Sequence, residues 1–138
     1  RFWYAVELSR PATLARFSAA EPLMLRPCGK RDFALWHVAP AEANGWALLG
    51  EISTKWTAAS AARFVAIRKP VALEERAALE VRARGAPGET IVVHFARPAG
   101  SDGVLPSIVV VRCTIPAGGF VNISMPSEEC SAGTAPSG

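Results

Sequence analysis

Three tryptophans, Trp36, Trp46 and Trp56, recur at intervals of ten residues. One strand with its turn is about ten residues long, so the three indoles would stand at equivalent heights on neighbouring strands. Aromatic planes presented by a sheet stack on the C–H faces of sugars. Asp32 and Arg63 are close enough in sequence to offer hydrogen bonds to the sugar hydroxyls. This set of five residues predicts a carbohydrate-binding surface.

The alternative place for these tryptophans is the hydrophobic core. A β-sandwich needs large side chains between its sheets, and a strand tryptophan usually supplies one. This alternative applies first to Trp36 and Trp46, which stand in or beside apolar stretches. Trp56 stands among the polar residues of 53–57, so exposure and burial remain equally open for it.

Catalytic and metal-binding patterns are absent from the sequence. His37 and His94 are its two histidines, and neither has a carboxylate two or four residues away to complete a chelating pair. There is no G-x-S-x-G nucleophile elbow, and the Gly-rich stretches read as turns rather than phosphate loops. We therefore expect no cofactor, no metal and no catalytic residues within this chain. A small jelly-roll enzyme using His37 or His94 is kept as a third hypothesis.

The charge pattern argues against two kinds of partner. The 15 basic and 12 acidic residues give a net charge of +3, and the densest basic stretch holds three arginines and three glutamates within residues 74–84. Nucleic-acid binding needs a one-sided basic stripe, so we expect no nucleic-acid partner. No apolar run approaches the roughly 20 residues of a spanning helix, so we expect no membrane span.

The three cysteines, Cys28, Cys113 and Cys130, include no C-x-x-C pair. Either all are free thiols in a reducing compartment, or one pair is bridged and one thiol is left over. Cys113 with Cys130 would close a short loop, and Cys28 with Cys130 a long one. The sequence does not choose among these arrangements, and it assigns no compartment.

Short alternating stretches separated by Gly and Pro turns predict an all-β domain. About eight antiparallel strands in a sandwich or jelly roll are expected. The stretches lie at residues 2–8, 13–17, 23–25, 32–38, 46–52, 63–69, 79–85, 90–96, 107–115 and 120–125. Residues 71–84 also have helix-forming composition, but a polar turn at 74–76 followed by a strand is preferred. Residues 1–130 are predicted to form a single domain, and 131–138 a flexible tail of linker composition.

Three connections predict β-hairpins. The Asn44–Gly45 pair would return residues 46–52 along 32–38. Residues 86–89 would join 79–85 to 90–96, and residues 116–119 would join 107–115 to 120–125.

Two segments carry a resemblance to a known kind of domain. They are L-E-V-R-A-R-G-A-P-G-E-T-I-V-V-H-F at 79–95 and V-V-V-R-C-T-I-P-A-G-G-F-V-N-I at 109–123, with N-G-W-A-L-L-G-E at 44–51 of similar character. They resemble the C-terminal β-sandwich accessory domains that follow the catalytic barrel in glycoside hydrolases. The resemblance implies a non-catalytic module of a larger carbohydrate-active enzyme, whose catalytic acids would lie on the barrel.

Both ends of the chain agree with a module of something larger. The chain opens at Arg1 without an initiator Met or a signal-peptide pattern, so we expect a processed chain or a piece of a longer one. The second hypothesis is a structural or interaction subunit of a protein assembly. It would dock through exposed edge strands or through the stretch that holds Arg82 and Arg84.

Overall fold

The computed structural model describes residues 1–9, 13–25, 29–30, 33–55, 57–68, 79–100 and 105–135. Within them the regular structure is entirely β, and every pair of neighbouring strands is antiparallel, which confirms the predicted fold class. The strands are β1 (Phe2–Glu7), β2 (Leu14–Ser18), β3 (Trp36–Pro40), β4 (Ala47–Gly50), β5 (Phe64–Arg68), β6 (Leu79–Arg84), β7 (Thr90–Arg97), β8 (Ser107–Thr114), β9 (Phe120–Met125) and β10 (Glu129–Ala132). None of the described residues forms a helix that is long and apolar enough to cross a membrane.

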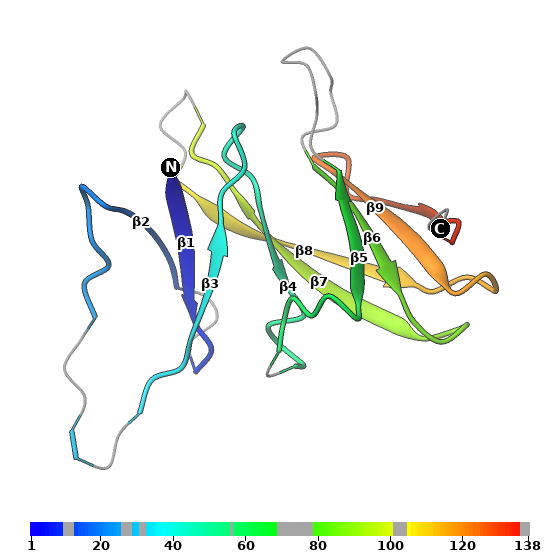
Figure 1. Ribbon diagram of the computed structural model, residues 1–138, viewed down its shortest axis with the longest axis horizontal. Helices are drawn as coiled ribbons and strands as arrows, with labels where there is room; N and C mark the ends of the chain where they lie inside the picture. Colours follow the sequence, from blue (N-terminus) through cyan, green and yellow to red (C-terminus); the bar gives the residue numbers. More distant parts are fainter. Residues whose placement is uncertain are drawn as a thin grey trace.

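The strands form three sheets, which we call the N-terminal sheet (β2-β1-β3), the central sheet (β4-β7-β8) and the C-terminal sheet (β10-β9-β6-β5). The long strands β7 and β8 run through the middle of the molecule. The N-terminal sheet lies towards one end and the C-terminal sheet towards the other (Figure 1).

Strand β4 and the adjoining part of β7 are covered on both faces. On β4, Leu48 belongs to the larger core shared with the C-terminal sheet, whereas Leu49 belongs to the smaller core shared with the N-terminal sheet. Phe95 and Ala96 divide in the same way on β7. Successive side chains of a strand point to opposite faces, so a strand buried on both sides needs a continuous apolar run. The run Ala47–Gly50 is buried throughout for this reason.

The three predicted hairpins are wrong. Strand β4 pairs with β7 rather than with β3, β6 pairs with β5 and β9 rather than with β7, and β8 pairs with β7 rather than with β9. The turn residues themselves are as expected, because Gly45, Gly88 and Gly119 have positive φ angles. Each of these turns passes the chain from one sheet to another. Alternation shows that two consecutive strands share a core, but not whether they lie side by side or face to face across it.

Some individual elements also differ from prediction. Residues 23–25 form no strand, and β10, which extends to Ala132, was not anticipated. The turn predicted at 74–76 lies outside the described residues.

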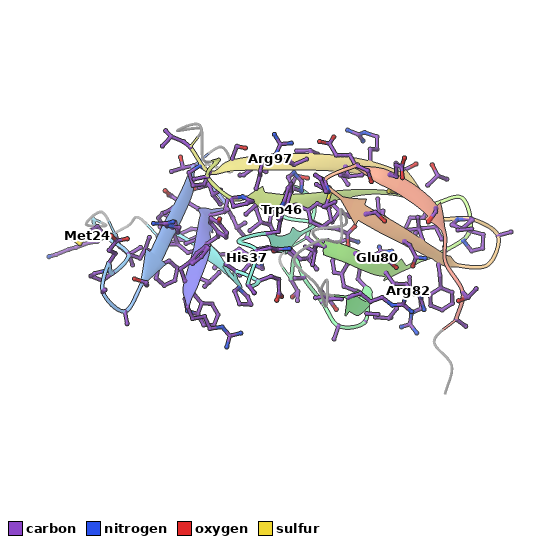
Figure 2. All side chains as sticks on the ribbon, turned by 90° about the horizontal axis from the view of Figure 1, so that it is seen from above. Met24, His37, Trp46, Glu80, Arg82 and Arg97 are labelled. Atoms are coloured by element: carbon purple, nitrogen blue, oxygen red, sulfur yellow. A yellow bond between two sulfur atoms is a disulfide. The ribbon has the colours of Figure 1, made fainter. Side chains whose placement is uncertain are left out.

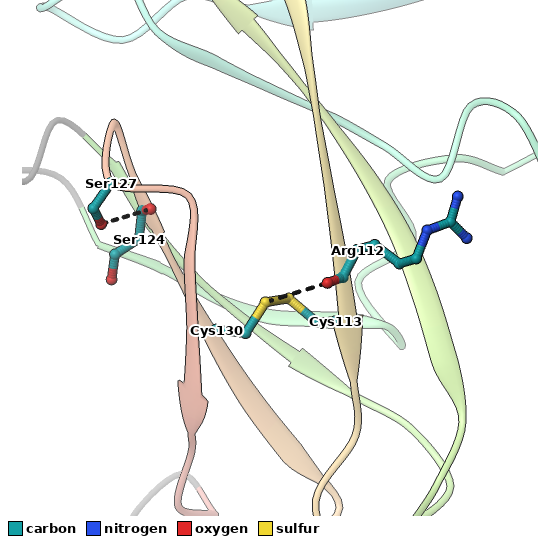
Figure 3. Close-up of a disulfide and its surroundings, with 5 residues drawn as sticks. All are labelled: Arg112, Cys113, Ser124, Ser127 and Cys130. Carbon is teal, nitrogen blue, oxygen red and sulfur yellow. Dashed lines mark hydrogen bonds between the residues drawn. A yellow bond between two sulfur atoms is a disulfide. The ribbon is translucent and has the colours of Figure 1, made fainter.

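A disulfide joins Cys113 of β8 to Cys130 of β10 and so links the central sheet to the C-terminal sheet (Figure 3). The two Cα atoms are 5.9 Å apart. Cys113 is buried in the larger core, and Cys130 lies on an exposed edge strand. Of the arrangements left open by the sequence, the structure contains the short-loop bridge. Cys28 lies outside the described residues.

Candidate functional site

Trp46 is part of the larger core and is only 7% exposed. The guanidinium of Arg97 lies 5.9 Å from the centre of the indole, beside it in Figure 2. With so little of the residue open to solvent, Trp46 fits the predicted core position better than the predicted sugar-stacking position.

Trp36 is the first residue of β3, where it is partly buried and lies opposite Glu7 of β1. Trp56 and Asp32 lie outside the described residues. Their roles in ligand binding, and that of Trp36, stay predictions.

Arg63 holds three parts of the chain together. Its Nε donates to Glu51 Oε2 (3.0 Å), its Nη1 donates to the Arg84 carbonyl (2.8 Å), and both terminal nitrogens donate to the Glu89 carboxylate. The hydrogen bond from Arg63 lowers the pKa of Glu89, and the same bond raises the pKa of Arg63. The side chain of Arg63 is 14% exposed. These donors are occupied within the protein, so a sugar would have to compete with them.

The candidate site is a pocket of about 540 Å³ that we call the Phe33 pocket. It is lined by Leu8, Ser9, Phe33, Leu35, Ile52, Ser53, Thr54 and Lys55. Three segments meet there: the end of β1, the residues before β3 and the turn after β4.

Antiparallel pairing brings two of these segments together. Glu7 of β1 lies opposite Trp36 of β3, and the amide of Leu8 donates to the carbonyl of Leu35 (2.8 Å). The third segment is a tight turn, because the amides of Thr54 and Lys55 both donate to the Glu51 carbonyl (3.0 Å each). The pocket is therefore built on hydrogen-bonded backbone.

The lining combines an aromatic ring with polar groups. Phe33 is 81% exposed, and Leu8, Leu35 and Ile52 provide further apolar surface. Hydroxyls come from three residues of the lining and an ammonium from Lys55. Ser9 Oγ donates to the Glu7 carboxylate (2.7 Å), which orients this hydroxyl. A sugar needs this pairing of an apolar face with hydrogen-bonding groups.

Phe33 was missed because residues 32–38 were predicted to be a strand. The strand begins only at Trp36, so Phe33 precedes it and is exposed. One signal does lie in the sequence: Phe33 follows Asp32 and Lys55 precedes Trp56, and both of those neighbours were predicted ligand residues.

The second cavity, which we call the His94 cavity, has a volume of about 730 Å³. It is lined by Thr13, Leu14, Ser53, His94, Pro106, Ser107, Ile108 and Val110. His94 is 6% exposed, and its Nδ1 lies 3.2 Å from the Gly50 carbonyl. A carbonyl only accepts, so Nδ1 carries the ring proton and Nε2 is an acceptor. Burial lowers the pKa of His94, and the bond to Gly50 opposes this shift, so the ring is neutral at neutral pH.

The two histidines line different depressions. His37 lies on β3, in a small apolar groove with Phe64 and Ile67 of β5, whereas His94 lies in the central sheet. No cluster of three or more His, Cys, Asp or Glu side chains suited to a metal ion occurs among the described residues.

His37 carries a buried ring nitrogen, Nε2, that has no hydrogen-bond partner within the part of the chain that the structure describes. Burial lowers the pKa of His37 below its ordinary value of 6.5. We expect His37→Leu to raise the free energy of unfolding by about 1 kcal/mol at neutral pH, because it removes an unsatisfied polar atom. The measurement is urea unfolding followed by circular dichroism.

The pH dependence of this effect has a defined sign. A pKa lowered by folding gives stability that is present above the unfolded pKa and is lost as the pH falls through the folded value. The advantage of His37→Leu should therefore grow between about pH 7 and pH 5. His37→Gln is the control, because glutamine keeps a polar group at this position. A Leu variant that is less stable at both pH values would contradict this account.

Comparison of the chain with protein-family models, with curated proteins and with solved structures found no match.

Proposed function

We propose that this chain is a non-catalytic β-sandwich module that binds carbohydrate at the Phe33 pocket and is accessory to a larger carbohydrate-active polypeptide. The observation that carries the proposal is the Phe33 ring, 81% exposed at a pocket that also presents hydroxyls and an ammonium group. A large aromatic side chain in water gains free energy when a ligand covers it. A pyranose offers that cover on one face and hydroxyls at its edge.

The composition of the pocket also favours binding over cleavage. Glycoside hydrolysis needs two carboxyl groups on either side of the bond that is broken. No Asp or Glu is found among the described residues that line the Phe33 pocket. Asp32 and Trp56, which neighbour Phe33 and Lys55 in the sequence, remain predicted ligand contacts on the sequence alone.

We expect Phe33→Ala to weaken carbohydrate binding by about tenfold or more, since loss of one stacked ring removes about 1.5 kcal/mol. Glycans bound by the wild-type chain are first found on a glycan array, and their affinities are then measured by titration calorimetry. Tryptophan fluorescence is a second readout, and Trp56→Ala should abolish any shift that the ligand causes.

Met24→Ala is the matched control. Met24 is 85% exposed on the same β2–β3 connection, does not line the pocket, and lies at the left end of the molecule in Figure 2. It should bind glycans like the wild type. The proposal fails if no glycan binds, or if Phe33→Ala binds as tightly as Met24→Ala.

A second candidate function is docking on a protein partner. Met24 and Leu25 are 85% and 57% exposed on a connection that extends away from the sheets (Figure 1). Exposed apolar side chains that lie together often mark a protein-interaction surface. The same two variants separate the candidates. If this connection docks on a protein partner, Met24→Ala should weaken binding of that partner, and the wild-type chain should bind no glycan.

A further inference from the structure

The Phe33 pocket and the His94 cavity meet at one residue, Ser53, which lines both. They also border two paired strands of the N-terminal sheet. Leu8 and Ser9, at the end of β1, line the first, and Thr13 and Leu14, at the start of β2, line the second. The two depressions are therefore neighbours along one surface.

The His94 cavity carries a fixed hydrogen-bond acceptor. The ring of His94 is more than nine-tenths buried and is held by the Gly50 carbonyl through Nδ1 (3.2 Å). Its neutral Nε2 has a free lone pair, so it can accept a hydrogen bond from a ligand hydroxyl. Because the imidazole is already oriented, little entropy is lost when a ligand binds it.

The rest of the His94 cavity repeats the mixed character of the Phe33 pocket. Ser53, Thr13 and Ser107 supply hydroxyl groups. Val110, opposite His94 on β8, is 50% exposed and offers an apolar contact. As in the first pocket, the described lining includes no Asp or Glu. Its chemistry suits an uncharged polyhydroxylated ligand.

We propose that the His94 cavity is a second subsite that continues the Phe33 pocket, so that the ligand is an oligosaccharide of at least two units rather than a single sugar. One unit stacks on Phe33, and the next places a hydroxyl against His94. Ser53 lies at the junction and contacts both. This inference rests on the proposed carbohydrate-binding function and names the class of ligand.

The test is a chain-length series measured by titration calorimetry. The probes are linear oligomers of one to six units of β-1,4-linked glucose, α-1,4-linked glucose and β-1,4-linked xylose. In the series that binds, the affinity should rise by at least about tenfold from one unit to two or three, and then level off as both cavities are filled. Equal affinity for one unit and for longer oligomers would overturn the second subsite and leave the proposed function standing. A failure of every series to bind would contradict both.

Variants locate the second subsite. His94→Ala should lower the affinity for the longer oligomers by about tenfold and leave single-unit binding unchanged, whereas Phe33→Ala lowers both. His94 is buried, so a second test is needed if His94→Ala does not fold. Ser107→Ala provides that test, because Ser107 is only partly buried at the start of β8. Thr114→Ala, on the same strand but lining neither cavity, is the control. Loss of single-unit binding in Ser107→Ala, or unchanged oligomer binding in both cavity variants, would overturn the inference.

Discussion

Replacing Arg63 with methionine should lower the free energy of unfolding by about 3 kcal/mol or more. The guanidinium binds Glu51, Glu89 and the carbonyl of Arg84, and the side chains of Arg63 and Glu51 are only 14% and 6% exposed. Removal of the cation leaves the Glu51 carboxylate without this counter-charge in a buried place. Breaking a buried ion pair by deleting one partner is among the most destabilising substitutions known.

Urea unfolding of wild type and variant measures this effect. Arg82→Met is the matched control, because among the described residues the Arg82 side chain makes one hydrogen bond, from Nε to Asn122 Oδ1 (2.9 Å), and its replacement should cost only about 1 kcal/mol. Adding Glu51→Gln and Glu89→Gln to Arg63→Met should recover part of the loss, since the unpaired charges are then gone. If Arg63→Met lowers the free energy of unfolding no more than Arg82→Met does, the contacts of Arg63 do not stabilise the fold. The predicted role of Arg63 in ligand binding would then gain support.

Removal of the disulfide by Cys113→Ala with Cys130→Ala should lower the free energy of unfolding by about 3 kcal/mol. The bridge spans 17 residues, so it restricts the unfolded chain. It also fastens the edge strand β10 to the central sheet, with whose strands β10 is not paired.

Unfolding curves with and without a reducing agent give the measurement. Wild type should lose stability in the reductant, and the double variant should be insensitive to it. Ser131→Ala, next to Cys130 on β10, controls for changes in the strand itself. The bridge would be contradicted if the wild type were equally stable with and without the reducing agent and mass spectrometry found three free thiols. A structural disulfide of this kind persists in oxidising compartments and is reduced in most others.

Local strand positions followed closely from the sequence. The stretch predicted at 120–125 coincides with β9, and those at 79–85 and 90–96 differ from β6 and β7 by one residue at one end. Strands β6 and β9 bury alternate residues, and a period of two is visible without knowledge of the partners.

The candidate site was anticipated only in kind. An aromatic residue beside hydrogen-bonding groups was the predicted chemistry, but Trp46 is buried among core side chains and Phe33 is exposed. Apolar character alone does not distinguish these two outcomes. Whether a ring is covered depends on where the pairing of its strand begins, and β3 begins three residues after Phe33.

The sequence by itself determined the all-β class and the turns at Gly45, Gly88 and Gly119, because these depend on neighbours within a few residues. Tertiary structure decided the pairing of strands, the partners of Arg63 and the meeting of two cavities at Ser53. Those features join residues that are distant along the chain. The same alternation is satisfied whether consecutive strands lie side by side or face each other across a core, so only the packed molecule distinguishes the two arrangements.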